Sequence, residues 1–310
     1  MIKFYKNRKW FYIISICLML IGVVSLFIRG VELDIQFSGG TKLSYSYTGD
    51  IQISDVETIV TNILGKKATA QTQTAVSDDS NRKTVVISVG GTSSLTTEQL
   101  DKITDEITSK YSANDIELYE TQSVEPYIGK RFFTNGIKAM LIAMVLIVIY
   151  VTFRFKIISG FSAALTALLA LFHDLLLVFF TFVIFGIPIN DGFVAVVLTI
   201  LGYSVNDTIV IYDKIRYNKR LYAGKMSIEE IADTSINQCL TRTINTSLMS
   251  GLAIALVFIF SLISGLTSVS HFALPLMVGI ISGCYSSLTL PGTLWVSWQK
   301  HGEKKKAKAK

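Results

Sequence analysis

Six stretches of about 20 mainly apolar residues constrain the fold of this 310-residue chain more than any other feature. Half of the residues are hydrophobic and only 17% are charged, a composition typical of a protein with several membrane spans. We therefore expect a polytopic α-helical membrane protein with six transmembrane helices. The six runs comprise residues 10–28, 137–153, 157–184, 192–212, 244–263 and 272–296.

The first apolar run follows four basic residues, as the apolar core of a secretion signal does. It is longer than such a core, and no cleavage site with small residues follows it. We expect residues 1–29 to form a cytoplasmic N-terminus and a retained first membrane helix.

The distribution of Lys and Arg predicts the orientation of the chain. In a six-span arrangement the N-terminal flank, residues 154–156, residues 214–225 and the basic tail 299–310 all fall on one side. Because basic flanks stay in the cytoplasm, both termini are predicted to be cytoplasmic. Residues 30–136 then lie on the other side with a net charge of −6, against +12 for the remainder. The basic excess thus reflects topology and attraction to anionic lipid, not binding of nucleic acid.

Residues 30–136 are polar enough to fold in water, and their patterns predict alternating strands and helices. Capping-box patterns at Ser54–Glu57 and Thr96–Gln99 each open a helix, the first reaching about residue 66. Strands are predicted at 41–47, 68–76, 83–89 and 116–124, with a turn at 77–81 between the second and third. This βαββαβ order predicts an extracytoplasmic α+β ferredoxin-like domain inserted between helices 1 and 2.

Small residues recur at helical spacing in the later spans, which allows membrane helices to approach closely. We therefore expect residues 137–298 to form a compact bundle of helices 2–6. Two such faces contain Ala163, Ala167, Ala170 and Asp174, and Gly279, Gly283 and Ser287.

Asp207 is the strongest functional candidate, because its carboxylate lies within an otherwise apolar run. A charge at that depth costs about 2.5 to 3.5 kcal/mol, so such residues usually face a protein interior or a water-filled path. Arg242, near the start of the next run, is the best available counter-charge, and such a pair can relay protons. Asn206 can hydrogen-bond either protonation state of a carboxyl group. The alternatives are that Asp207 bonds a hydroxyl such as that of Thr208 without titrating, and that Arg242 extends to the headgroups.

His173 and Asp174 are a second candidate pair, near the middle of the third apolar run. Two ionisable groups at that depth favour a functional role. Polar side chains also hold membrane helices together, so the pair either conducts protons or forms hydrogen bonds that fix the packing.

The sequence contains no Walker or nucleophile-elbow pattern, so we do not expect nucleotide hydrolysis. Its three cysteines lie in or beside different spans without C-x-x-C spacing. We accordingly predict no disulfide framework, no metal site and no cofactor.

Residues 202–210, GYSVNDTIV, with Asp213-Lys214-Ile215-Arg216 after them, resemble the signature of the SecF family of protein translocase subunits. Further landmarks of that family follow in the family's order, and the resemblance covers nearly the whole chain. Gln36, Tyr217 and Cys284 depart from the residues common in the family, but none of them is a candidate proton residue. The landmarks are residues 37–41, His173-Asp174, Arg242-Thr243 and residues 285–287.

The resemblance implies an accessory subunit of the Sec protein-export translocase, in the RND superfamily and in the bacterial cytoplasmic membrane. With SecD, such a subunit would use the proton motive force to drive late steps of preprotein translocation. Asp207 and Arg242 would line a proton path that residues of SecD complete. Further implied partners are the SecYEG channel with SecA, the YajC protein, the YidC insertase, the exported unfolded polypeptide and membrane lipid.

Two other functions are compatible with the sequence. One is a structural bridge between the channel and a partner, in which the buried charges only hold the bundle together. The other is a small-molecule exporter of the RND type, which would normally need a larger external region or a duplicated bundle; no second repeat is present. A lone carboxylate serves protons or sodium ions equally well, so the coupling ion stays open.

Overall fold

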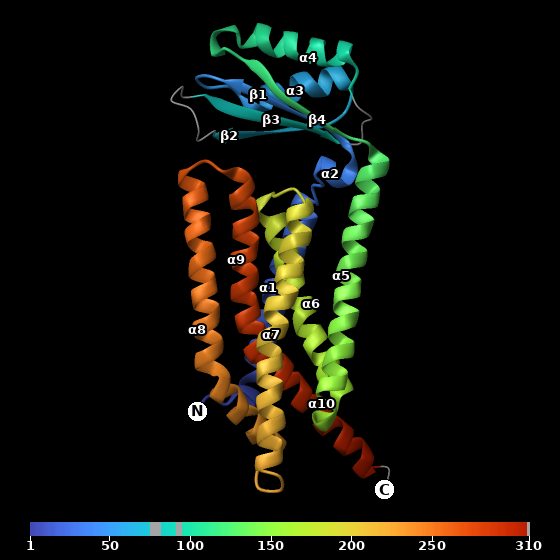
Figure 1. Ribbon diagram of the computed structural model, residues 1–310, viewed down its shortest axis with the longest axis vertical. Coiled ribbons are helices and arrows are strands. Elements are labelled where there is room, and N and C mark those ends of the chain that lie inside the picture. Colours follow the sequence, from blue (N-terminus) through green and yellow to red (C-terminus); the bar gives the residue numbers. More distant parts are fainter. Residues whose placement is uncertain (75–81, 91–94, 309–310) are drawn as a thin grey trace.

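The computed structural model describes residues 1–74, 82–90 and 95–308, as a bundle of long helices with a small α+β domain at one end (Figure 1). Within these residues six helical segments are long and apolar enough to cross a membrane, which confirms the predicted number of spans. They are α1 (Phe4–Arg29), α5 (Pro126–Arg154), α6 (Gly160–Phe185), α7 (Asp191–Leu221), α8 (Ile228–Ile263), and α9 (Thr267–Thr289) continued by α10 (Pro291–Lys308).

Several helices extend beyond the predicted spans: α5 begins at Pro126, inside the predicted domain 30–136, and α7 continues to Leu221. Two further differences have a clear local cause. Helix α8 begins at Ile228, well before the predicted residue 244, because Ser227 and Glu230 form a capping box ahead of its apolar part. The predicted last span, 272–296, is divided after Thr289, since Pro291 has no N–H to continue α9 and instead starts α10.

The domain between α1 and α5 has the predicted ferredoxin-like order. Its four strands form one antiparallel sheet in the order β2-β3-β1-β4, the arrangement of a split βαβ fold. The turn predicted at 77–81 and the end of the strand predicted at 68–76 lie outside the described residues. The elements are β1 (Gly40–Tyr47), α3 (Ile53–Leu64), β2 (Ala68–Thr74), β3 (Lys83–Gly90), α4 (Thr97–Lys110) and β4 (Glu117–Val124).

Only one of the two predicted capping boxes forms. Thr96 accepts a hydrogen bond from the Gln99 N–H and donates its own N–H to the Gln99 side chain, as predicted. The prediction at Ser54 is wrong, because α3 already begins at Ile53. The carboxylate of Glu57 instead accepts the N–H of Ala70 in β2, at 2.8 Å, and so ties the helix to the sheet.

The segment between α1 and the sheet is bonded to the loop that precedes α7. The Ile189 N–H donates to the Glu32 carbonyl at 2.8 Å, and the Asp34 N–H donates to the Ile189 carbonyl at 3.1 Å. The Asp191 N–H, at the first residue of α7, reaches Oε1 of Gln36 at 3.3 Å. The start of α7 is therefore attached directly to the base of the domain.

A tight turn connects the short helix α2 (Ile35–Ser38) to β1. Gly39 has φ of +71°, and a Cβ atom there would lie 2.3 Å from Cα of Pro126 at the start of α5. Only glycine fits both the left-handed backbone and this close approach.

In Figure 1 the sheet lies across one end of the bundle, whereas the N-terminus and the end of α10 lie at the other.

We expect Gly22→Ala to destabilise the protein by about 1 to 3 kcal/mol, the usual cost of overpacking. A Cβ atom at Gly22 of α1 would lie 2.1 Å from ring atoms of Phe180 in α6. The measurement is an unfolding titration with sodium dodecyl sulfate. Gly202→Ala is the matched control, because no atom lies within 4 Å of its Cβ position. Equal midpoints for the two variants would contradict close packing of α1 on α6.

Candidate functional site

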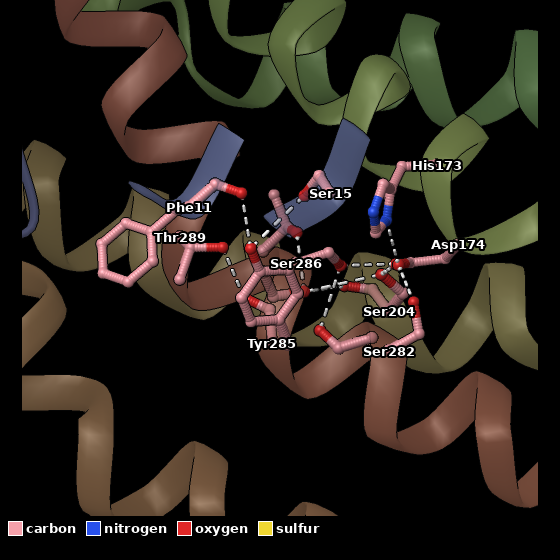
Figure 2. A network of polar contacts seen from close by, with 12 residues as sticks. Phe11, Ser15, His173, Asp174, Ser204, Ser282, Tyr285, Ser286 and Thr289 are labelled. Atoms are coloured by element: carbon pink, nitrogen blue, oxygen red, sulfur yellow. Dashed lines mark hydrogen bonds and ion pairs between the residues drawn. The ribbon is translucent and has the colours of Figure 1, made fainter. Parts of the chain in front are cut away.

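Asp174 is the centre of a hydrogen-bond network inside the bundle (Figure 2). Its side chain is fully buried. Oδ1 accepts the hydroxyl of Ser282 at 2.6 Å, and Oδ2 accepts those of Ser286 at 2.6 Å and Ser204 at 2.7 Å. Such lengths are typical of hydroxyl groups bound to an ionised carboxylate. One side chain of α6 therefore joins α6 to α7 and α9.

Helical spacing and small residues explain how this cluster forms. Ser282 and Ser286 are four residues apart, so they share a face of α9. On the neighbouring predicted small-residue face, a Cβ atom at Gly279 would lie 2.6 Å from Ile200, and one at Gly283 would lie 3.3 Å from Cβ of Ser204. The absence of side chains there lets α7 approach α9 closely enough for Ser204 to reach Asp174.

His173 extends the network toward α1. Its Nδ1 lies 3.1 Å from Oδ1 of Asp174, and its Nε2 is buried without a hydrogen-bond partner among the described residues. The ring lies beside that of Tyr285, with the centroids 6.4 Å apart. The Tyr285 hydroxyl donates to the Phe11 carbonyl of α1 at 2.7 Å. The sequence-predicted pair His173 and Asp174 is thus brought together, and it contacts α7 and α9 directly and α1 through Tyr285.

A second branch of hydroxyl groups runs along α7. Ser287 donates to the carbonyl oxygen of Ser204 at 3.1 Å, and Thr208 donates to the hydroxyl of Ser287 at 3.2 Å. Thr208 is therefore bonded to α9 and not to Asp207, so this alternative partner for Asp207 is not observed. Ser204 and Thr208 together define the face of α7 that is fixed against α6 and α9.

Asp207 lies in the interior with only 5% of its surface exposed. Its Oδ2 atom is buried and has no hydrogen-bond partner in the described part of the chain. Arg242 acts on this carboxylate by Coulomb attraction, but no ion pair of 4.0 Å or less joins the two residues, and the Arg242 side chain is exposed. Asn206 is also exposed on the surface of the bundle. The predicted cluster of Asp207, Arg242 and Asn206 is thus only loosely assembled.

The two buried acids differ in what they can do chemically. The oxygen atoms of Asp174 accept several donors, so its charge is stabilised in place. The carboxylate of Asp207 lacks such donors, so a proton or a small cation can bind to it without displacing protein contacts. Over the ranges that the structure describes, no three His, Cys, Asp or Glu side chains are grouped as a metal site requires.

Sequence reasoning did not identify the donors Ser204, Ser282 and Ser286 as site residues. The available signal was the pair of serines four residues apart in the last apolar run, opposite a buried acid. Serine is also a common small packing residue in membrane helices, so that spacing alone does not separate the two roles.

Residues 103–301 match the family model described as protein export membrane protein SecD/SecF, C-terminal. Together with the six spans, this match defines a membrane component of protein export. The SecF translocase subunit of Petrotoga mobilis is 32% identical, with 98% of both chains covered. That of Synechocystis is 31% identical over 96% of this chain and 94% of its own. The chain belongs to the SecF family of protein translocase subunits, and is a multi-pass transport component of Sec export.

Solved structures show the same architecture. The crystal structure of SecDF from Thermus thermophilus, described as a translocon-associated membrane protein, matches with a TM-score of 0.79 and 26% identity over 96% of this chain. SecDF in its super-membrane-facing form matches with a TM-score of 0.69 and 26% identity over 99% of this chain. This chain spans only 39% and 40% of those two SecDF chains.

We expect Asp174→Asn to lower the stability of the bundle by about 2 kcal/mol, because hydrogen bonds between membrane helices average about 0.6 kcal/mol each and several are lost or weakened. Ser282→Ala, which removes one donor, should cost less than half as much. A detergent unfolding titration measures both effects. Thr199→Ala is the control, since this hydroxyl bonds only the carbonyl of Ala195 in its own helix. Unchanged stability in Asp174→Asn would show that the network does not hold the bundle.

Proposed function

We propose that this chain works with SecD to drive late steps of preprotein translocation with the proton motive force. The observation that carries the proposal is the Asp207 carboxylate, which is buried at membrane depth with an unpartnered oxygen. A buried charge without donors is costly, so this group gains most from binding a proton. Membership of the SecF family supplies the context of protein export.

The physical step is a change in the contact between α7 and α8. When Asp207 is ionised, Coulomb attraction draws it toward Arg242 of α8. Binding of a proton removes this attraction, and the two helices then repack. Each elementary charge that crosses the membrane yields about 2.3 kcal/mol per 100 mV, which biases such a two-state contact strongly.

The two faces of α7 give this repacking a direction. Ser204 and Thr208 hold one face against α9 and Asp174. Asp207 lies on the adjoining side of the helix, and its Oδ2 atom has no hydrogen-bond partner among the residues that the structure describes. The N-terminal end of α7 is bonded to Gln36, and the loop before it to Glu32. A tilt of α7 is therefore transmitted to the base of the ferredoxin-like domain, which moves relative to the bundle and pulls or holds the emerging chain.

The partners follow from the surfaces left open. Asn206 and Arg242 are exposed beside Asp207, so residues of SecD would cover them and complete the proton path. We place both termini in the cytoplasm of a bacterial cell, with residues 30–136 outside. SecYEG with SecA delivers the preprotein to this assembly, and YajC and YidC are further candidate neighbours. Protons are the proposed coupling ion.

We expect Asp207→Asn to abolish the gradient-dependent part of export, because the amide side chain of asparagine does not take up and release a proton as a carboxylate does. Export of a preprotein into inverted membrane vesicles, with and without an ionophore that collapses the gradient, measures this part. Asp213→Asn is the control, since that acid, on the same helix, is half-exposed and already paired with Arg154 and Arg216.

Two results would contradict the proposal. Full gradient-dependent export in Asp207→Asn would exclude the proton relay. Loss of SecD from the purified complex in that variant, with export reduced equally with and without the gradient, would favour the structural bridge. Co-purification in mild detergent tests the association with SecD directly. Failure to recover SecD with the unaltered chain would also contradict the proposed function.

A further inference from the structure

Two buried polar atoms on the neighbouring helices α7 and α8 have no hydrogen-bond partner among the described residues. They are Oδ2 of Asp207 on α7 and Oγ1 of Thr243 on α8. Thr243 is only 1% exposed, so its hydroxyl is not bonded to bulk water either. Buried polar atoms in proteins are nearly always paired with protein or with ordered water, so each of these two atoms is available to bind a polar group.

The contacts on either side place these two residues at the same level of the interface between α7 and α8. One turn earlier on α7, the Tyr203 hydroxyl donates to that of Ser247 at 3.1 Å. About one turn later, the thiol of Cys239 points to the Val210 carbonyl, with sulfur and oxygen 3.9 Å apart. Residues 239, 243 and 247 share one face of α8, and residues 203, 207 and 210 share one face of α7. The antiparallel register between them therefore sets Asp207 opposite Thr243.

The Thr243 hydroxyl is unusual for a membrane helix because it does not bond its own backbone. Threonine hydroxyls in these helices otherwise commonly donate to the carbonyl three or four residues earlier, which satisfies them locally. Those that do so are Thr134, Thr166, Thr181, Thr199, Thr246, Thr289 and Thr293. The hydroxyl of Thr243 thus stays free to bind a partner between α7 and α8.

We propose that Asp207 and Thr243 together bind one water molecule, and that Thr243 is a positioning residue of the ion path. The two side chains do not bond each other directly. A water between them donates one hydrogen to the carboxylate and accepts the hydroxyl hydrogen of Thr243, which satisfies both atoms. The site therefore needs a hydroxyl on α8, and not only a charge on α7.

This inference rests on the proposed proton relay and adds a step to it. A proton driven by the gradient reaches the bound water and forms hydronium. One O–H bond of the hydronium breaks as its proton forms a bond to Oδ2 of Asp207. Neutral water remains, still held by Thr243, and the same water accepts the proton when Asp207 releases it. The Thr243 hydroxyl donates to the water when the water is neutral and accepts a hydrogen from it when it is hydronium, so it keeps the water within hydrogen-bonding distance of the carboxylate through both steps.

The test compares Thr243→Val, which keeps the shape but loses the hydroxyl, with Thr243→Ser, which keeps the hydroxyl. We expect Thr243→Val to lower the gradient-dependent rate of export by about tenfold, the upper end of the effect of losing one hydrogen bond between neutral groups. Thr243→Ser should restore most of that rate. The rates are measured in membrane vesicles that contain the complete complex, with and without an ionophore. Thr246→Val is the control, because that hydroxyl bonds only backbone carbonyls of α8.

The outcomes separate this inference from the proposed function. Normal gradient-dependent export in Thr243→Val, together with loss of it in Asp207→Asn, would overturn the water site and leave the proton relay standing. Normal gradient-dependent export in both variants would overturn both. An equal fall with and without the gradient, or a failure of Thr243→Ser to restore the rate, would assign Thr243 to packing and overturn the inference.

Discussion

The carboxylate of Asp174 and its serine donors hold the centre of the bundle together. In a membrane no hydrophobic effect pulls helices toward each other, so close packing and hydrogen bonds between helices set their arrangement. A charge buried inside a membrane protein is tolerable only when donors surround it, and Ser204, Ser282 and Ser286 provide them from α7 and α9. The position of α7, and with it that of Asp207, depends on this contact.

Helix α7 therefore has one side whose contacts with α6 and α9 are fixed by hydrogen bonds and an adjoining side without such bonds. One side is bonded through Ser204 and Thr208, whereas on the adjoining side Oδ2 of Asp207 has no hydrogen-bond partner within the described ranges. Its first residue is bonded to Gln36 at the base of the domain. In the proposed mechanism, a change of charge at Asp207 acts on the ferredoxin-like domain through α7.

The fold could be predicted because its signals are local. Apolar runs define the spans, and strand alternation and the capping box at Thr96 define the domain. The start of α8 and the end of α9 were not predicted, because a polar capping box and Pro291 set these limits and hydropathy does not detect either feature. The burial of Asp207 was also predictable. The donors of Asp174 were not, because they lie 30, 108 and 112 residues away in the sequence and only the folded bundle brings them together.

The central claim is that Asp207 gains and loses a proton as the gradient is applied. The most direct measurement is difference infrared spectroscopy of the complex with SecD in sealed vesicles, with isotope-labelled aspartate and Asp207→Asn to assign the signal. We predict that imposing a proton gradient exchanges a carboxylate band of Asp207 for a carboxylic acid band. A spectrum in which the Asp207 signal stays the same with and without the gradient would contradict the account.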